Sequence, residues 1–390
     1  MMLAATLRLP QPDGTLMPFV PCAVDVHELS DRPRPRSRRV FAAVHVVCDP
    51  LAYEDPAVSS RIDWDATLEY RRLLWRLGFG VAEAMDTSQR GMGLRWENAR
   101  ELVHRSAQEA RACDGLIISG AGTDDLDGGR IYSLDEIERA YLNQCAYIEE
   151  CGSRIVLMAS RALARSARSA EDYARVYASV LKQVREPVII HWLGETFDPQ
   201  LAGYWGSHDL DEATETCLAV MRENQRKIEG IKISLLDPQR EIALRRRLPA
   251  GVRMYTGDDF HFPSLIAGDE RGYSDALLGI FDAIAPAAAA ALAALDRDDR
   301  ASYDRILSST LDLSRHIFAA PTYAYKTGIV FLAYLNGHQA HFRMIAGAES
   351  ARSIAHLSRV FVTAQAAGLI RDIERAAKRM ACVLALSGID

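Results

Sequence analysis

Short apolar runs alternate with longer amphipathic segments along the chain from residue 40 onward. Each run is rich in β-branched and other apolar residues over a length that is typical of a buried strand. The segments between the runs place apolar residues at helical spacing, as in residues 64–77 and 97–112. The predicted strands cover residues 40–48, 80–87, 115–122, 154–161, 187–194, 230–236, 252–259 and 276–286.

The order of these elements predicts the topology of the sheet. Strand and helix alternate at intervals of roughly 20 to 45 residues, which favours parallel pairing through right-handed crossovers. Gly78, Gly152 and Gly251 stand just before predicted strands, where a preceding helix commonly ends in a left-handed residue. Eight such units close into a barrel. We therefore expect an α/β fold, namely a (β/α)8 TIM barrel.

The two ends of the chain differ in pattern from the barrel region. Residues 1–39 contain a Pro-Asp-Gly turn and the string DRPRPRSRR, which is typical of an exposed linker. Residues 287–390 indicate only helices and begin with an alanine-rich segment. We expect a short N-terminal extension and linker over residues 1–39, the barrel over 40–286, and a C-terminal helical extension packed on the barrel over 287–390.

Composition and charge narrow the class of function. The 390 residues carry a net charge of −6 without a long block of like charge, which disfavours a nucleic-acid or membrane partner. Seven scattered cysteines without a Cys-x-x-Cys pair indicate reduced thiols rather than disulfides or a thiolate zinc site. The sequence shows neither a signal peptide nor a membrane-spanning apolar run. We expect a cytoplasmic protein that acts on a small molecule.

In a (β/α)8 barrel the active site lies at the carboxyl ends of the strands. Polar residues at or just after the predicted strand ends are therefore the candidates for chemistry. Carboxylates, hydroxyls and histidines predominate among them. They are Asp49, Glu83, Asp86, Thr87, Ser88, Gln89, Gly122, Thr123, Ser160, Arg161, His191, Glu195, Lys232, Ser234, Asp258, Asp259 and His261.

Lys232 differs from the other candidates because it lies inside the apolar string GIKISLL. Strand alternation places it on the face opposite Ile231 and Ile233, and one face of a barrel strand points into the lumen. A lysine there loses hydration, which lowers its pKa and leaves an amine that can attack a carbonyl group. An ion pair at the barrel rim with Asp258 or Asp259 is the alternative interpretation.

Several strings stand in a specific order over nearly the whole chain from residue 40. They are WDATLEYRRLLW, GVAEAMDTSQRGMGL, HWLGETFDP, GIKISLLD, YTGDDF, LLGIFDAIAP and LSRHIFAAPTYAYKTG. In these strings the chain resembles the dihydrodipicolinate synthase and N-acetylneuraminate lyase family of class I aldolases, and most of all an uncharacterised, DUF993-type branch. The resemblance implies a lyase or aldolase that forms a Schiff base with a 2-oxo acid or keto-sugar acid.

The resemblance also implies roles for individual residues. IEGIKISL matches the strand that carries the Schiff-base lysine, which makes Lys232 the nucleophile. Asp86-Thr87-Ser88-Gln89-Arg90 takes the place of the loop Gly-Thr-Thr-Gly-Glu that holds a substrate carboxylate, and it keeps both hydroxyls but not the first glycine. MYTGDD matches a Ser-Gly-Asp-Asp signature, which places Gly257 beside the lysine and Asp258 and Asp259 at the rim.

The fourth strand departs from the family pattern. The family has Pro-Tyr-Tyr there and uses one tyrosine as a proton relay, whereas this chain reads Met158-Ala159-Ser160-Arg161. Ser160 and His191 are the candidates to replace the relay, and His191 could instead be hydrogen-bonded in the barrel wall. Tyr255 is a weaker candidate because strand alternation could turn it outward. Arg161 is either a clamp for a substrate carboxylate or phosphate or a surface arginine.

Two other functions fit the same strand ends. A divalent-metal sugar isomerase or lyase would need an oxygen-rich site, although the spacing of its candidate ligands carries no metal signature. A ligand-binding barrel without catalysis would explain the missing relay tyrosine. The aldolase interpretation requires a carbonyl substrate but neither a metal nor a cofactor. The metal ligands would be Glu83, Asp86, His191, Asp259 and His261.

The resemblance also bears on assembly and on the C-terminal region. It implies a homo-oligomer, either a dimer or a tetramer, with Tyr132 and the 120–130 loop as contact elements. Lys326 corresponds to a family lysine with a structural role. His338 and His341 are spaced as on one face of a helix, and they either approach the active site or take part in helix packing.

Overall fold

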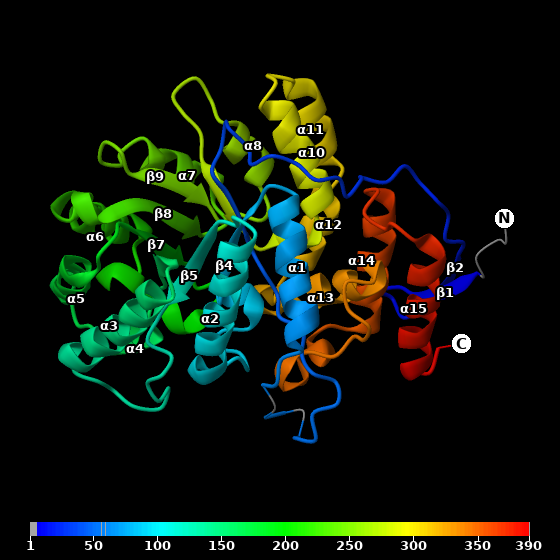
Figure 1. Ribbon diagram of the computed structural model, residues 1–390, viewed down its shortest axis with the longest axis horizontal. Coiled ribbons are helices and arrows are strands. Elements are labelled where there is room, and N and C mark those ends of the chain that lie inside the picture. Colours follow the sequence, from blue (N-terminus) through cyan, green and yellow to red (C-terminus); the bar gives the residue numbers. More distant parts are fainter. Residues whose placement is uncertain (1–5, 56, 59, 390) are drawn as a thin grey trace. The chain divides into compact units, whose positions relative to one another are not determined.

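The computed structural model describes residues 6–55, 57–58 and 60–389 and contains a closed barrel of eight parallel strands (Figure 1). The (β/α)8 fold expected from the sequence is thereby confirmed. Each observed strand overlaps one of the eight predicted runs. The strands are β3 (Val40–Ala43), β4 (Gly80–Glu83), β5 (Ile117–Ala121), β6 (Arg154–Leu157), β7 (Val188–Leu193), β8 (Ile228–Ser234), β9 (Arg253–Thr256) and β10 (Asp275–Leu278).

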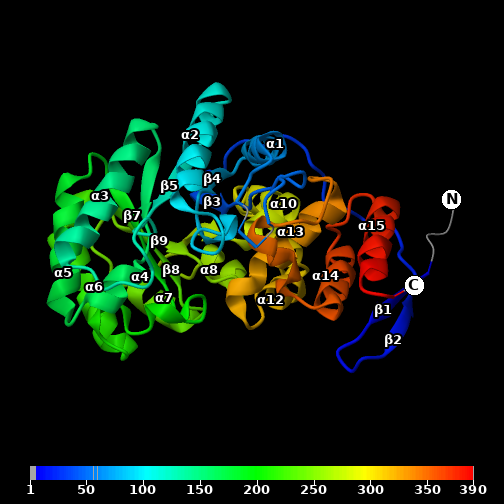
Figure 2. The same cartoon turned by 90° about the horizontal axis from the view of Figure 1, so that it is seen from below.

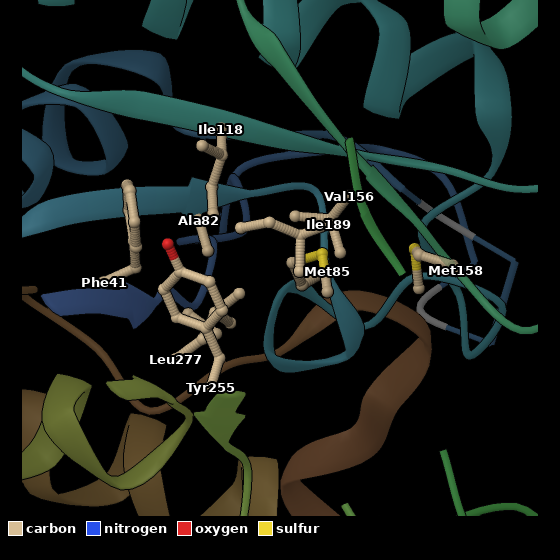
Figure 3. Packing of buried hydrophobic residues seen from close by; sticks show 10 residues of the cluster. Phe41, Ala82, Met85, Ile118, Val156, Met158, Ile189, Tyr255 and Leu277 are labelled. Atoms are coloured by element: carbon tan, nitrogen blue, oxygen red, sulfur yellow. The ribbon is translucent and has the colours of Figure 1, made fainter. Parts of the chain in front are cut away.

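The strands follow the chain around the barrel, and β10 closes the circle by pairing with β3. Buried apolar side chains fill the lumen, so the barrel is a packed core and not a pore (Figure 3). Successive interior residues alternate with residues that face the surrounding helices. The cluster consists of Phe41, Ala43, Ala82, Met85, Ile118, Val156, Met158, Ile189, Tyr255 and Leu277.

Tyr255 belongs to this interior cluster, so the expectation that it could turn outward is wrong. Its hydroxyl nevertheless points away from the carboxyl ends of the strands, because it donates a 2.8 Å hydrogen bond to Glu229 near the start of β8. Glu229 also accepts hydrogen bonds from Arg39 and Arg154, which begin or precede two other strands. Tyr255 therefore closes the amino-terminal end of the barrel and does not serve as a proton relay beside Lys232.

The chain divides into two compact units. The barrel unit comprises residues 38–44 and 80–279, and the second unit comprises residues 1–37, 45–79 and 280–390. All residues proposed for the active site belong to the barrel unit. That residues 1–39, 40–286 and 287–390 form separate domains stays a prediction.

Four of the seven helices of the barrel unit, α3, α4, α6 and α7, begin at a side-chain cap that the sequence supplies. Ser133 caps α3 by accepting a hydrogen bond from the backbone N–H of Glu136, whose carboxylate bonds back to the backbone N–H of Ser133. Asp209 and Asp237 cap two later helices in the same way through their carboxylates. The helices are α2 (Trp96–Ala112), α3 (Leu134–Glu150), α4 (Arg161–Ser166), α5 (Ala170–Gln183), α6 (Leu210–Glu223), α7 (Pro238–Arg245) and α8 (Phe262–Ala267).

The second unit consists mainly of helices, as the pattern after residue 287 predicts. Its first helix, α1, matches the amphipathic segment 64–77. None of the helices in the described ranges is both long and apolar enough to span a membrane. The unit contains α1 (Trp64–Arg76), α9 (Ile280–Ala283), α10 (Ala285–Leu295), α11 (Arg300–Ser308), α12 (Leu311–Ile317), α13 (Tyr325–Asn336), α14 (Ile354–Ala366) and α15 (Ile373–Leu386).

The N-terminal extension contains a β-hairpin that the sequence interpretation did not include. Strands β1 (Leu7–Pro10) and β2 (Leu16–Phe19) pair antiparallel around the Pro-Asp-Gly turn, and β1 lies next to α14 (Figure 2). Asp13 stabilises the turn by accepting hydrogen bonds from the backbone and hydroxyl of Thr15. Strands of four residues are too short to stand out by periodicity alone.

The predicted helical pairing of His338 and His341 is wrong, because α13 ends at Asn336. Gly337 follows with a φ of 82°, a left-handed conformation that favours glycine and ends the helix. The ring of His338 packs against Tyr70 of the same unit, and burial lowers the pKa of His338 to about 4. Lys326 is buried in α13 and donates a hydrogen bond to the carbonyl of Tyr323.

Candidate active site

Lys232 lies in the middle of β8, in register with His191 of β7 and Tyr255 of β9. Only 6% of the residue is exposed. Burial lowers the pKa of Lys232, whereas the negative charges of Asp86 and Asp259 act in the opposite direction. Asp258 is engaged elsewhere, since its carboxylate accepts hydrogen bonds from the backbone N–H groups of Phe260 and His261. Whether Lys232 acts as a nucleophile or forms an ion pair with Asp259 stays a prediction.

Gly257 follows β9 directly beside this lysine. A Cβ atom at this position would lie 2.8 Å from Cε of Lys232 and 2.2 Å from Oγ of Ser234. Both distances are shorter than side-chain contacts allow, so only glycine lets the two strands and the lysine approach so closely. The structure brings Gly257 and Lys232 together as the sequence comparison predicted.

His191 is fully buried next to Lys232. Its Nε2 lies 3.2 Å from Oγ of Ser234, and its Nδ1 has no hydrogen-bond partner in the described part of the chain. Burial and then the positive charge of Lys232 lower the pKa of His191 well below its usual value. The imidazole is therefore neutral near pH 7 and retains one ring nitrogen that is not engaged by the protein.

The loop after β4 forms a short 3-10 helix over Asp86–Ser88. Ser88 uses its hydroxyl within this turn by donating to the carbonyl of Met85, and Thr87 is buried. Gln89 adopts a left-handed φ of 64° and donates its side-chain amide to the carbonyl of Met92. Asp86 is the most exposed of these four residues, and it contributes a negative charge near Lys232.

Arg90 holds this loop against the neighbouring strand, a role that the sequence did not indicate. Its buried guanidinium forms an ion pair with the more exposed Asp124 and donates to the carbonyls of Ala84 and Gly120. It also donates to the side chain of Gln144. Arg90 is therefore fully engaged and fixes the ends of β4 and β5 relative to each other.

Ser160 lies at the end of β6, but its hydroxyl already has two partners. It caps α4 by accepting from the backbone N–H of Leu163, and it lies 2.6 Å from the hydroxyl of Thr123. The backbone N–H of Ser160 donates to the hydroxyl of Tyr204. Among these hydroxyls, that of Thr123 belongs to a residue that lines the cavity described below.

The remaining predicted substrate contacts are Arg161, which lies in α4, and Asp258 and Asp259, which follow β9. Arg161 forms an ion pair with Asp198 and donates to the carbonyl of Gly91. Asp258 is buried and accepts hydrogen bonds from the backbone N–H groups of Phe260 and His261. Asp258 thus stabilises the turn after β9, whereas the influence of Asp259 reaches Lys232.

A cavity of about 500 Å³ opens at the carboxyl ends of β4 to β7. It receives Asp86 and His191 from the strand ends, and Arg161 from the helix after β6. Lys232, Ser88 and Ser160 are not among its lining residues, whereas His191, which pairs with Lys232 across β7 and β8, is one of them. The lining residues are Asp86, Arg90, Gly91, Gly93, Leu94, Arg95, Gly122, Thr123, Asp124, Leu126, Asp127, Gly128, Met158, Ala159, Arg161, Ala162, Arg165, His191, Leu193, Asp198, Gln200 and Leu201.

The candidate metal ligands do not gather at one point. Glu83 is fully buried, and its carboxylate accepts a hydrogen bond from the backbone N–H of Ala84. His261 pairs with Asp258, with 3.0 Å between its Nδ1 and the carboxylate. No three histidine, cysteine or acidic side chains of the residues described here lie close enough together to hold a metal ion.

One family model matches almost the entire chain. It is described as a protein of unknown function (DUF993), and it matches residues 7–389. The chain belongs to the DUF993 family. No curated protein matches the chain.

Solved structures show which fold this DUF993 member shares. YagE, a prophage protein of the dihydrodipicolinic acid synthase family from E. coli K12 in complex with pyruvate, has 12% identity and a TM-score of 0.63, covering 90% of this chain and 99% of its own. Dihydrodipicolinate synthase from Bacillus clausii has 14% identity and a TM-score of 0.62, covering 84% and 97%. The enzyme from Aquifex aeolicus has 13% identity and a TM-score of 0.60, covering 90% and 98%. At these identities the likeness establishes the fold.

The sequence of this DUF993 member did not reveal two ion pairs of the site. Asp198 lies far from Arg161 along the chain, and Asp124 lies far from Arg90, so neither ion pair has a local signal. Thr123 lines the cavity. In the sequence, its position after a predicted strand, in the string Gly-Ala-Gly-Thr, marked it as a candidate.

Proposed function

We propose that this DUF993 protein is a class I lyase or aldolase in which Lys232 forms a Schiff base with a 2-oxo acid or keto-sugar acid. The observation that carries the proposal is the burial of Lys232 inside a barrel strand, where only 6% of the residue is exposed. A buried lysine loses the hydration of its ammonium form, and its pKa falls accordingly. The neutral amine is the nucleophile that imine formation requires.

The reaction can be written with all atoms balanced. The amine attacks the keto carbon of a 4-hydroxy-2-oxo acid, and loss of one water gives a protonated imine. The C3–C4 bond then breaks and its electrons move to the imine nitrogen, while a base removes the C4 hydroxyl proton and an aldehyde leaves. Protonation of the resulting enamine at C3 and addition of one water release the 2-oxo acid and restore the amine. Bond formation is the reverse.

His191 is the residue best placed to move these protons. It is adjacent to Lys232, its pKa is lowered by burial, and its Nδ1 has no partner among the described residues. It also lines the cavity, as does the hydroxyl-bearing residue Thr123. Ser160 acts through Thr123 in this proposal, because its own hydroxyl caps α4.

The loop of Asp86, Thr87, Ser88 and Gln89 is proposed to hold the substrate carboxylate. The side chain of Ser88 is used inside the turn, so the backbone of this loop and Thr87 are the groups proposed for that contact. Gly257 leaves space for Lys232, while Asp258 shapes the turn that carries Asp259. Arg161 remains proposed as a substrate contact from the cavity wall, with Asp198 holding its guanidinium in place.

One structural neighbour supports the choice of a first substrate to test. The E. coli protein YagE was crystallised in complex with pyruvate. Pyruvate is therefore the simplest 2-oxo acid with which to probe Lys232. A homo-oligomeric assembly and a cytoplasmic location stay predictions.

Borohydride trapping tests this proposal directly. Wild-type protein incubated with pyruvate and sodium borohydride should gain one reduced pyruvate adduct, located by peptide mass spectrometry at Lys232. Lys232→Ala should gain none, while the matched control Lys182→Ala, which removes an exposed lysine of α5, should react like the wild type. An adduct on Lys232→Ala at the wild-type rate would refute the Schiff-base mechanism.

A further inference from the structure

Four arginines line the cavity, and two of them form an ion pair with a carboxylate of the described residues. Arg90 is paired with Asp124, and Arg161 is paired with Asp198. Arg95 and Arg165 also line the cavity, and both are exposed. No carboxylate in the described ranges lies within ion-pair distance of either guanidinium. Positive charge is therefore available on this wall.

The side-chain hydrogen bonds described for Arg165 go to neutral oxygen atoms, and Arg95 does not cap its helix. Arg95 precedes α2 as its N-cap residue and makes no side-chain hydrogen bond to the helix. Arg165 lies in α4 and donates to the carbonyl of Gly128 and the side-chain oxygen of Gln200. Neutral oxygens position a guanidinium without cancelling its charge. Arg165 is thus held in place and remains cationic toward the cavity.

The acidic residues of the cavity are largely committed elsewhere. Asp124 and Asp198 neutralise Arg90 and Arg161, and Asp86 acts on Lys232. Asp127 is the remaining lining carboxylate, and it accepts a hydrogen bond from the backbone N–H of Gly129 in its own turn. The whole lining holds four arginines and four aspartates, but next to the two guanidinium groups of Arg95 and Arg165 only one further carboxylate, that of Asp127, remains, and this local balance favours an anionic ligand.

Arg95 and Arg165 lie at the helices beyond the strand ends, whereas His191 and Asp86 lie at the strand ends themselves. His191 is part of β7 and Asp86 directly follows β4, but Arg95 and Arg165 stand at or inside the helices after β4 and β6. A substrate whose carbonyl reaches Lys232 past His191 would thus extend its other end toward these helices. A cavity of about 500 Å³ has room for such an extended small molecule.

We propose that Arg95 and Arg165 bind a second anionic group, a carboxylate or a phosphate, at the end of the substrate distant from its carbonyl. This inference rests on the proposed function of Lys232, because it assumes that the carbonyl end of the substrate is bound at Lys232. It narrows the substrate class to 2-oxo acids with two anionic ends. In the cleavage direction the released aldehyde would carry the second anion.

Binding of two probes that lack a carbonyl group tests the subsite without imine formation. Glutarate represents the dicarboxylate and glycerol 3-phosphate the phosphate, and both are titrated calorimetrically into wild-type protein and Lys232→Ala. At least one probe should bind both proteins. Its dissociation constant should rise at least about tenfold in Arg95→Met/Arg165→Met, because charge-assisted hydrogen bonds are lost. The probe that responds identifies the anion.

The matched control is Arg168→Met, which removes an exposed arginine that follows α4 but does not line the cavity. It should leave binding of both probes unchanged. If the double variant does not fold, Arg95→Met is tested alone, because the side chain of Arg95 makes no hydrogen bond that caps α2. A several-fold loss of affinity for the probe is then expected. The proposal is overturned if neither probe binds the wild type or if removing the arginines leaves their affinities unchanged.

Pyruvate trapping distinguishes failure of the anion-site proposal from failure of the Schiff-base proposal. Pyruvate has no second anion, so Arg95→Met/Arg165→Met should trap it at the wild-type rate. Trapping that persists in Lys232→Ala, together with weakened probe binding in the double variant, would refute the lysine mechanism and support the anion site. Normal trapping at Lys232 with arginine-independent probe binding would refute the anion site alone.

Discussion

Gly257 and Lys232 lie so close that no side chain fits between them. A Cβ atom at residue 257 would lie 2.8 Å from Cε of the lysine, and the carbonyl oxygen of Ile233 would be 2.7 Å away. β8 and β9 are paired directly at this level of the barrel. The position of the amine therefore depends on the absence of a side chain on the neighbouring strand.

Gly257→Ala should displace Lys232 and slow pyruvate trapping on the order of a hundredfold, as expected when a reacting group moves by about 1 Å. The trapping rate is measured by mass spectrometry, and circular dichroism verifies that the barrel remains folded. Gly129→Ala is the matched control, because its Cβ would meet only Asp127, at 3.5 Å. A folded Gly257→Ala protein with the wild-type rate would show that this close contact is not needed.

Asp86→Asn should move the pH profile of trapping toward lower pH. Burial lowers the pKa of Lys232, and the carboxylate of Asp86 partly raises it again, so removal of that charge favours the neutral amine. Hydroxyacetone with borohydride is the suitable probe because it carries no charge. Asp127→Asn removes another cavity carboxylate that does not act on Lys232, and its profile should match the wild type. A shift toward higher pH in Asp86→Asn would contradict the assignment.

His191→Asn should separate imine formation from proton transfer. Trapping of pyruvate should stay within a few-fold of the wild type, because Lys232 is retained. Exchange of the pyruvate methyl protons in D2O, followed by proton NMR, should slow on the order of a hundredfold when the general base is lost. Equal exchange rates in the variant and the wild type would assign the proton relay to another residue, with Thr123 as the next candidate.

Glu241 should make the stability of the protein depend on pH. This carboxyl group is buried between Ser274 and Thr256, and burial raises its pKa to about 8. The unfolded chain ionises near pH 4.5 while the folded state keeps its proton, so this contribution to stability is complete below about pH 4.5 and is lost as pH rises through about 8.

Glu241→Gln cannot ionise, so the free energy of unfolding should fall less between pH 5 and pH 8.5 than in the wild type. A difference of about 4 kcal/mol is expected, because about three pH units lie between pH 5 and the folded-state pKa of about 8 and each contributes about 1.4 kcal/mol. Urea denaturation at the two pH values measures it, and the exposed Glu223→Gln in α6 provides the control. An unchanged pH dependence in Glu241→Gln would show that Glu241 is ionised in the folded protein at neutral pH.

The sequence alone determined the barrel and the position of its unusual lysine. Buried parallel strands require continuous apolar runs, so the pattern around Ile231 and Ile233 both marks β8 and makes Lys232 conspicuous. That a glycine lies beside the lysine was implied only by the family resemblance of the string MYTGDD. These features depend on neighbours along one strand or on the regular order of strands, which a linear pattern records.

Only the tertiary structure decided which polar groups are free to act. Ser160 and Arg161 are adjacent to a strand end in the sequence, but the former caps α4 and the latter is paired with Asp198. Tyr255 could not be assigned to a face from a short strand, and its hydroxyl binds Glu229 at the opposite end of the barrel. Hydrogen bonds and ion pairs join residues that are distant along the chain, so only the folded barrel shows that, among the described residues, Asp124 pairs with Arg90 and Asp198 with Arg161.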